Sequence, residues 1–345
     1  MATEVTSQDL LVIQKAAKRV FEQHIDKKYY NVKPWTPAIC QQFATLSLDD
    51  LLFKDYFLNL DKNLLYPLVL DTLYEVWDSW ESGEKLWYLV LLCAIGSGKT
   101  ELNAIMQWLQ WYRLTTRFFD FRKKLKLMPN ATTCLIQMNR DAKRAKEVTF
   151  SRIYPLFQCP FNRDYFPPDT RTASKIKIVR NNTAIFPGSG GAASGLGYDI
   201  YAAGLDEMTA LKIVDKSVLG DTGGGKYDVA QVMFDEVDKR MDSRFAEDRG
   251  TLVMFSQRRT GKEFIENFAR QIENGTVKNG LVKKYSFWEA VGWRNRKFYK
   301  DDNVFYFNKK TFSIVIDSAE VELLTKRKQE LKYGKLGKGM HTLQN

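Results

Sequence analysis

Histidine is nearly absent from the sequence: among 345 residues there are two, His24 and His341, and both lie near the ends of the chain. A Ser-His-Asp hydrolase needs a histidine beside its nucleophile, and many metal enzymes need several histidine ligands. The scarcity of histidine therefore argues against both classes of enzyme.

Cysteine is also scarce, and its four residues lie far apart in the chain. They are Cys40, Cys93, Cys134 and Cys159. Because no Cys-x-x-Cys pair is present, the spacing indicates neither a zinc knuckle nor a disulfide framework, and it fits a reducing cytosol. The sequence also lacks an uncharged apolar run of about 18 residues, so we expect no membrane-spanning helix.

The composition is that of a folded, basic chain. Hydrophobic residues make up 44% and aromatic residues 13% of the sequence, which is enough for a substantial core. Lysine and arginine number 52 against 41 aspartate and glutamate, a formal net charge of +11. Such a balance favours polyanionic partners, nucleic acid first and an anionic membrane second. The length suits one large domain or two modest ones.

Hydrophobic patterning predicts an α/β fold. Residues 86–92 (LWYLVLL) form a continuous apolar run, which is typical of a strand buried on both faces. Further strands are predicted at 132–138, 200–205 and 251–255, with a hairpin over 175–186. Helices are predicted over most of 10–80, at 100–113, from 141 onward and at 229–241. Strands separated by helices imply a mainly parallel sheet with right-handed crossovers.

The same patterning divides the chain into three predicted regions. Residues 1–60 are predicted to be helical and to form part of a small lid subdomain. Residues 61–286 hold the predicted core. Residues 287–345 supply the rest of the lid, with an antiparallel pair over 304–316, a charged helix over 319–332 and a glycine-containing linker.

A glycine-rich turn follows the first predicted strand and opens a helix. Its residues are Cys93, Ala94, Ile95, Gly96, Ser97, Gly98, Lys99 and Thr100. A strand, such a turn and a helix in this order form a phosphate-binding loop, whose backbone N–H groups face a polyphosphate. We expect Lys99 to reach the β- and γ-phosphates of ATP and the Thr100 hydroxyl to bind Mg²⁺. Cys93 replaces the usual first glycine, and the alternative interpretation is a glycine turn followed by a chance lysine.

Two adjacent carboxylates, Asp206 and Glu207, end the predicted strand at 200–205. In an ATPase, Asp206 would hold the Mg²⁺ shell and Glu207 would polarise the attacking water. An acidic pair at a strand end is also common on protein surfaces, but this pair follows a later strand of the same pattern as the phosphate loop. The two elements predict a P-loop NTPase of the ASCE (additional strand, catalytic glutamate), RecA-like branch, with a mainly parallel sheet flanked by helices.

Two polar residues, Ser256 and Gln257, end the predicted strand at 251–255. A polar side chain at this place can lie beside the γ-phosphate and sense its loss. A simple strand-end cap is an equally good alternative. The sequence alone leaves both interpretations open.

These three elements, in this order and spacing, resemble the ATPase domain of the large terminase subunit of tailed bacteriophages. The motifs are CAIGSGKT, GLGYDIYAAGLDEM and LVMFSQRR, and the similarity covers about residues 60–270. The first motif is shared by many P-loop enzymes, whereas the combination points to terminases.

The resemblance implies an ATP- and Mg²⁺-dependent motor that packages double-stranded DNA. Members of the family assemble as a ring, usually a pentamer, on the portal of an empty procapsid, act with a small terminase subunit, and work in the cytoplasm of the infected host. The resemblance would assign phosphate and Mg²⁺ contacts to Lys99 and Thr100, Mg²⁺ binding to Asp206, catalysis to Glu207, and coupling to Ser256 and Gln257.

The sequence departs from the family pattern at several places. Ile95 stands where many members have an arginine, and no clear glutamine marks an adenine-binding motif, although Tyr66-Pro67 lies about where one would fall. Members also carry a C-terminal nuclease domain of the RNase H type. No carboxylate cluster of that kind follows residue 286, so we expect an excised ATPase domain or a nuclease-free relative, without nuclease activity.

Motor ATPases also need an arginine finger on the departing γ-phosphate, which contributes about 10³–10⁵ in rate. After Phe255 only 90 of the 345 residues remain, short of the roughly 150 of a second RecA-like domain. We therefore expect the arginine to come from a neighbouring subunit or from a mobile loop in cis. Arg140 and Arg144, which follow the strand at 132–138, are the candidates. A solvated helix face is the alternative interpretation of both residues.

Residues 113–126 are the candidate DNA-contact segment, because six basic residues alternate there with three phenylalanines. A helix pair with a basic face is an equally good interpretation. Three other functions stay open beside packaging: a helicase-like or other translocating ATPase, a P-loop kinase or nucleotide switch, and a structural ring component that binds ATP without turnover. Glu207 argues against a kinase, which needs no water-activating base.

Overall fold

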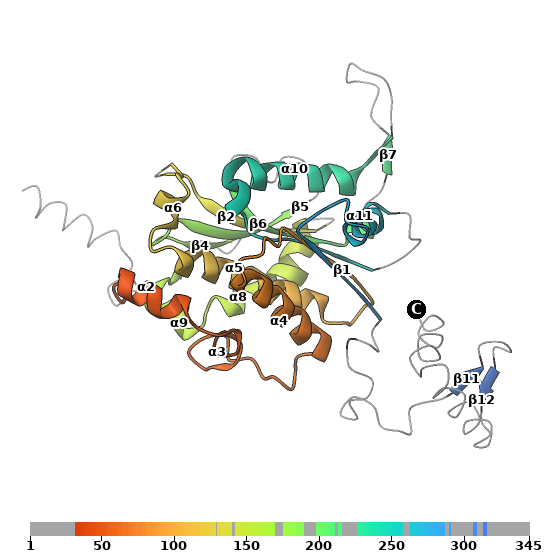
Figure 1. Ribbon diagram of the computed structural model, residues 1–345, viewed down its shortest axis with the longest axis horizontal. Helices are drawn as coiled ribbons and strands as arrows, with labels where there is room; N and C mark the ends of the chain where they lie inside the picture. Colours follow the sequence, from red (N-terminus) through yellow and green to blue (C-terminus); the bar gives the residue numbers. More distant parts are fainter. Residues whose placement is uncertain are drawn as a thin grey trace, which may run out of the picture.

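A sheet of eight strands runs through the centre of the computed structural model (Figure 1). The structure describes residues 32–128, 130–139, 142–169, 175–189, 198–210, 213–215, 226–257, 263–286, 290, 306–308 and 313–315. The strands of this sheet are β1 (Tyr88–Cys93), β2 (Thr133–Asn139), β3 (Pro168–Asp169), β4 (Ile176–Ile178), β5 (Thr183–Ser189), β6 (Asp199–Asp206), β9 (Leu252–Ser256) and β10 (Gly280–Tyr285).

The strand order is β10-β1-β9-β6-β2-β5-β4-β3. All neighbours from β10 to β5 are parallel, and β3 and β4 extend the sheet in antiparallel fashion. The prediction of a mainly parallel sheet is confirmed, and so is the hairpin, whose strands β4 and β5 are joined across Asn181 and Asn182. The strand β9 lies between β1 and β6.

Helices cover both faces of the sheet. In Figure 1, α10 (Val229–Phe245) lies on one face, and α4 (Pro67–Glu81), α5 (Lys99–Arg117) and α8 (Ser151–Leu156) lie on the other. Successive side chains of β1 point to opposite faces of the sheet, so they belong to two separate hydrophobic clusters. Leu89 and Leu91 belong to the cluster with α4 and α5, whereas Val90 and Leu92 belong to the cluster with α10 and α11 (Phe264–Glu273).

The helix α5 is the central support of the site. Nearly all of its residues are buried, and Trp108, Trp111 and Tyr112 are fully enclosed by α2 (Pro37–Ala44), α9 (Pro160–Tyr165) and the sheet. The Tyr112 hydroxyl donates to the backbone carbonyl of Phe43 at 2.7 Å. Residues 37–53 therefore share one core with α5, and the predicted domain boundary at residue 60 stays a prediction.

The remaining elements are short. They are α3 (Leu48–Phe53), α6 (Phe121–Lys124), α7 (Ala142–Arg144), the π-helix η2 (Ala145–Phe150), the 3-10 helices η3 (Met208–Ala210) and η4 (Ala246–Asp248), and the antiparallel pairs β7 (Ile213–Asp215) with β8 (Lys226–Asp228) and β11 (Tyr306–Asn308) with β12 (Ser313–Val315). The pair β11–β12 confirms the antiparallel strands predicted over 304–316. No helix in the described parts of the chain combines the length and apolar character needed to cross a bilayer.

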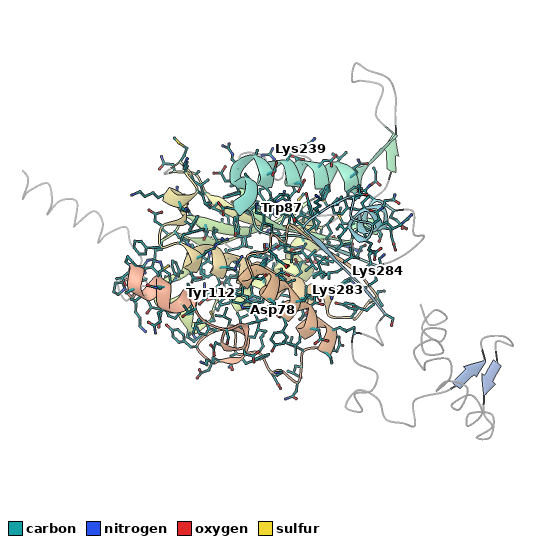
Figure 2. The ribbon with its side chains drawn as sticks, in the orientation of Figure 1. Asp78, Trp87, Tyr112, Lys239, Lys283 and Lys284 are labelled. Atoms are coloured by element: carbon teal, nitrogen blue, oxygen red, sulfur yellow. The ribbon has the colours of Figure 1, made fainter. Side chains whose placement is uncertain are left out.

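The sequence prediction missed β10, which forms one edge of the sheet beside β1. Two lysines, Lys283 and Lys284, interrupt its apolar pattern (Figure 2). Each lysine forms an ion pair with a glutamate of a neighbouring helix, Glu75 of α4 and Glu273 of α11. An edge strand tolerates such side chains because it lacks a further strand beside it, and a pattern built on buried strands overlooks it.

Candidate nucleotide-binding site

The predicted phosphate loop joins the end of β1 to the start of α5. Two glycines within it, Gly96 and Gly98, have φ angles of 76° and 82°, the left-handed region that glycine adopts at little cost. Gly98 is the N-cap of α5. The loop therefore turns back sharply, and no side chain caps the first N–H groups of α5. The positive end of the α5 dipole at this place is suited to an anion.

The residues around Gly98 leave no room for a side chain at this position. A Cβ atom at this position would lie 2.8 Å from Val69 Cγ2 and 3.0 Å from Tyr66 Cδ2. The start of α4 therefore packs directly against the loop. At the other end of the loop, Cys93 is almost completely buried, and burial raises the pKa of its thiol to about 11. Cys93 thus acts as a small core residue of β1 at the position where a glycine is usual.

The Lys99 side chain turns toward the loop, where its ammonium donates to the Ala94 carbonyl at 3.3 Å. Burial lowers the pKa of Lys99, and the negative charges of Asp206 and Glu207 act in the opposite direction. The ammonium and both carboxylates therefore lie within electrostatic reach of one another. Lys99 and the acidic pair, which are more than 100 positions apart in the chain, meet at the carboxyl edge of the sheet.

Asp206 is the last residue of β6 and is 5% exposed. Its Oδ2 accepts hydrogen bonds from Asn139 Nδ2 (3.1 Å) and Thr149 Oγ1 (3.2 Å), and its Oδ1 accepts from the Glu207 N–H at 2.8 Å. Burial raises the pKa of Asp206 to about 6, with the Glu207 charge adding to the effect, while the hydrogen bonds and Lys99 act against it. A buried carboxylate of this kind gains from a cation beside it.

Glu207 adopts a φ angle of 55°, which is unusual for a residue with a side chain. Its carboxylate is about one-third exposed and accepts two hydrogen bonds of 3.1 Å from Nη1 of Arg144 in α7. The turn directs Glu207 away from the line of β6 and toward the helix that follows β2. Of the two predicted finger residues, Arg144 thus contacts the catalytic candidate within the same chain, and Arg140 lies outside the described residues.

A cavity of about 470 Å³ opens beside the phosphate loop. Its walls include Gly96, Gly98, Lys99 and Thr100 from the loop and α5, and Leu64 and Tyr66 from the segment before α4. The volume lies within the usual range for small-molecule sites. The Arg152 guanidinium of α8 also lines the cavity and pairs with Glu101. Tyr66, singled out in the sequence as the place of an adenine motif, therefore lies at the cavity.

The other predicted contacts are placed as follows. Ser256, at the end of β9, is 1% exposed. Its hydroxyl oxygen accepts from the Thr209 N–H at 3.0 Å and lies 2.6 Å from Thr209 Oγ1. Ser256 therefore fixes the turn after Glu207, and its role toward a nucleotide stays a prediction. Gln257 is half-buried, and Ile95 is 72% exposed at the tip of the loop.

Two residues that hold Asp206 in place were not predicted from the sequence. Asn139 ends β2, and Thr149 lies in the π-helix η2. A polar residue at the carboxyl end of a strand is the one signal that could have identified Asn139, because such ends meet at one edge of a parallel sheet. Nothing in the local sequence marks Thr149, since the π-helical bulge sets its direction, and such bulges often occur at functional sites.

The site fits a magnesium ion. Mg²⁺ is usually held by one or two carboxylates together with substrate phosphates and water, and here the buried Asp206 carboxylate and the Thr100 hydroxyl are the available oxygen ligands. In the parts of the chain that the structure describes, no group of three or more His, Cys, Asp and Glu residues could hold a metal by itself. Asp206 and Thr100 are thus the residues that would hold such an ion.

No protein-family model matches the sequence, and no curated protein matches it. Solved structures do match. The HK97 bacteriophage large terminase shares 12% identity over 74% of this chain and 48% of that chain, with a TM-score of 0.49. The large terminase of a thermophilic bacteriophage, in complex with ADP, shares 11% identity over 68% of this chain and 50% of that chain, with a TM-score of 0.42.

A third match is the ATPase domain of the large terminase of Thermus phage P74-26, with 13% identity over 62% of this chain and 84% of that chain and a TM-score of 0.34. The chain spans about half the length of the HK97 protein. All three are large terminases of phages, the family that the motifs resemble. A likeness at this level of identity concerns the fold alone.

Proposed function

We propose that the chain is an ATPase and the motor part of a machine that moves double-stranded DNA into a viral procapsid. One observation carries the ATPase part: β1 and β6 both run parallel to β9, which lies between them, so the phosphate loop with Lys99 and the pair Asp206 and Glu207 lie at the same edge of the sheet. The cavity lined by Gly98, Lys99 and Thr100 supports a nucleotide as the ligand.

The residues divide the work of hydrolysis as follows. The loop N–H groups and Lys99 bind the β- and γ-phosphates, and Thr100 and Asp206 would hold a magnesium ion. When bound, this ion neutralises charge on the phosphate oxygens. The Glu207 carboxylate orients a water molecule and takes its proton as the water oxygen bonds to the γ-phosphorus. The bond from phosphorus to the β–γ bridging oxygen then breaks, and ADP and phosphate are the products.

The ion pair of Glu207 with Arg144 bears on the role of both residues. Each oxygen of the Glu207 carboxylate accepts a hydrogen bond from Arg144, so neither oxygen is free to accept one from a water molecule. Glu207 must leave Arg144 before it can act on water. Arg144 then becomes available for the γ-phosphate, in its own subunit or in a neighbour, as proposed for the arginine finger.

The DNA-packaging part rests on the basic charge, the surface at the end of α5 and the motif resemblance. Lys123, Lys124 and Lys126 are exposed, and Phe119 is 48% exposed. The Lys124 ammonium lies 5.9 Å from the centre of the Phe118 ring. Cations beside exposed aromatic rings suit contacts to a nucleic-acid backbone without base readout. The proposed partners are double-stranded DNA, a portal-bearing procapsid, a small terminase subunit and further copies of this chain in a ring, in the cytoplasm of an infected host.

The test is ATP hydrolysis measured alone, with double-stranded DNA, and with DNA and portal-bearing procapsids. We expect stimulation by both additions. Glu207→Gln should retain ATP binding and lose about 10²–10⁴-fold in turnover, and Lys99→Ala should lose nucleotide binding itself. Glu147→Gln, at an exposed position of η2, is the matched control. Near-normal turnover in Glu207→Gln contradicts the assignment of the base.

Two further outcomes separate the alternatives. Unwinding of a forked duplex without any effect of procapsids favours a helicase-like translocase. Phosphate transfer to an acceptor other than water, at a rate that DNA leaves unchanged, favours a kinase or switch.

A further inference from the structure

A row of amide side chains is buried between α5 and the sheet. It consists of Asn103, Gln107 and Gln110 of α5 and Gln137 of β2, each at most 2% exposed. A helix face that packs on a sheet is normally apolar, because a buried polar group loses its hydration and must find a partner to regain it. Asn103 Oδ1 and both polar atoms of Gln107 have no hydrogen-bond partner among the described residues. Stability alone therefore does not account for this row, and such a departure from the packing rule is typical of a functional site.

One pair within the row is joined by a short hydrogen bond. Asn103 Nδ2 donates to Gln137 Oε1 at 2.6 Å, and both residues are fully buried. This bond connects α5 directly to β2. A hydrogen bond depends on distance and angle, whereas an apolar contact is non-directional. The pair therefore fixes the place of the helix along the strand more closely than apolar side chains of the same size would.

The positions of the pair in the two elements relate it to the nucleotide site. Asn103 follows Lys99 by four positions, so the two residues lie on one face of α5, about 6 Å apart along its axis. Gln137 precedes Asn139 by two positions, so these residues lie on one face of β2, about 6.6 Å apart. Asn139 in turn donates to Asp206. The pair thus lies one step behind Lys99 on the helix and one step behind the hydrogen-bond partner of Asp206 on the strand.

A glycine of β6 makes room for the pair. Gly204 is paired with Gln137 in the register of β6 and β2 and precedes Asp206 by two positions. A Cβ atom at Gly204 would lie 2.5 Å from Asn103 Oδ1 and closer still to Gln137 Oε1. The two amides therefore occupy the space that a side chain at this position would need. The elements α5, β2 and β6 meet at this point, one step behind the site.

We propose that Asn103 and Gln137 are positioning residues for ATP hydrolysis. Their hydrogen bond holds the first turn of α5 at a fixed place against β2 and β6, so that the Lys99 ammonium keeps its distance from the Asp206 carboxylate. The inference rests on the proposed ATPase function, because it concerns the alignment of groups that act on the nucleotide. Both amide side chains are fully buried, so they act through Lys99 and Asp206. A misplacement of about 1 Å can cost about 10²-fold in rate.

The test compares three variants with the wild type in ATP turnover, ATP affinity and the midpoint of urea unfolding. Asn103→Leu and Gln137→Met each replace one amide by an apolar side chain of similar size. Each single variant leaves the other amide without its partner, so its unfolding midpoint should fall. The double variant removes both partners at once, which can be nearly neutral for stability, so its midpoint should return toward that of the wild type.

Turnover separates positioning from packing. It is measured under conditions in which the unfolding curve shows each variant to be folded. We expect turnover in the double variant to fall about 10²-fold although its unfolding midpoint is restored, because apolar side chains do not fix the place of the helix. The loss should fall on kcat rather than on ATP affinity, since alignment matters most in the transition state.

A buried hydrogen bond further along α5 supplies the matched control. Trp111 Nε1 donates to Thr183 Oγ1 at 2.9 Å, at the start of β5. Thr183→Val removes this acceptor and keeps the shape of the side chain. The variant should lower the unfolding midpoint and leave turnover unchanged, because the bond lies away from the phosphate loop.

The outcomes decide between this inference and the function on which it rests. A loss of turnover confined to the variants of Asn103 and Gln137 supports the inference. Wild-type turnover in the double variant, or an equal loss in Thr183→Val, overturns the inference and leaves the ATPase function standing. A wild-type protein without ATP turnover in the same assay overturns the proposed function, and the inference with it.

Discussion

Replacing Asp206 by asparagine should stabilise the nucleotide-free protein at neutral pH, although Asp206 belongs to the proposed site. Burial raises the pKa of this carboxyl from 3.8 to about 6. The folded protein therefore disfavours the charged form relative to the unfolded chain. The penalty is absent below pH 3.8, grows as the pH rises, and is complete above pH 6.

The size of the penalty follows from the displacement of the pKa. A displacement from 3.8 to about 6 corresponds to about 3 kcal/mol when complete and about 1 kcal/mol at pH 4.5. An asparagine cannot ionise and avoids this penalty. Its amide group, however, faces one of the donors that now serve Asp206, from Asn139, Thr149 or the Glu207 N–H, which costs about 1 kcal/mol at every pH.

The assay is urea unfolding of the wild-type protein and Asp206→Asn at pH 4.5, 6.0 and 7.5, without nucleotide or divalent cations. We expect the two proteins to be nearly equal at pH 4.5 and the variant to be more stable by about 2 kcal/mol at pH 7.5. The difference in unfolding free energy between the two proteins at each pH cancels the contributions of all other titrating groups, which the two proteins share.

Asp164→Asn is a control of opposite sign. Burial acts to raise the pKa of the Asp164 carboxyl, but hydrogen bonds from Lys33 and Tyr56 act more strongly in the other direction, so the pKa is lowered. Its carboxylate therefore stabilises the fold above pH 3.8, and that contribution is lost as the pH falls through the lowered pKa. Asp164→Asn should be less stable than the wild type at pH 7.5, with a smaller difference in acid. A stability difference for Asp206→Asn that stays constant between pH 4.5 and 7.5 refutes the argument.

Two further predictions concern the loop and the ion pair. Gly98→Ala should destabilise the fold more than Gly83→Ala, because both glycines have φ angles of 82° but only Gly98 would meet Val69. In each variant the left-handed backbone conformation of the alanine costs about 1–2 kcal/mol of unfolding free energy. The contact with Val69 adds about 1–3 kcal/mol in Gly98→Ala. Equal losses of unfolding free energy in the two variants would contradict the packing of Val69 against Gly98. Arg144→Ala should change the unfolding free energy by less than about 1 kcal/mol, since its pair with Glu207 is exposed. The same variant should lose at least about 10³-fold in ATP turnover, and recovery on mixing it with Glu207→Gln subunits shows action between subunits, whereas no recovery at any ratio places Arg144 in cis.

The sequence predicts the parts of the site that lie in one continuous segment with a characteristic pattern of residue types. The apolar run of β1 followed by the glycines and Lys99 is such a pattern, because burial on both faces and a sharp turn each require particular residue types. The strand ending in Asp206 and Glu207 is another. Their meeting follows from the parallel sheet, which brings the carboxyl ends of its strands to one edge.

The remaining parts of the site depend on contacts that no local pattern encodes. Asn139 and Thr149 reach Asp206 across 67 and 57 positions of sequence. Their partnership depends on the order of β2 and β6 in the sheet and on a π-helical bulge. The contact of Arg144 with Glu207 likewise depends on the unusual φ of Glu207. Such features arise from tertiary packing.

The burial of α5 has a mechanical consequence. A helix of 19 residues is about 28 Å long, and tight packing on nearly all sides prevents it from bending to absorb a displacement. A displacement of its first turn, at the phosphate loop, would therefore be transmitted to its last turn almost undiminished. Arg113 and Arg117 would move with it, so a displacement at one edge of the sheet would become a translation at the opposite edge.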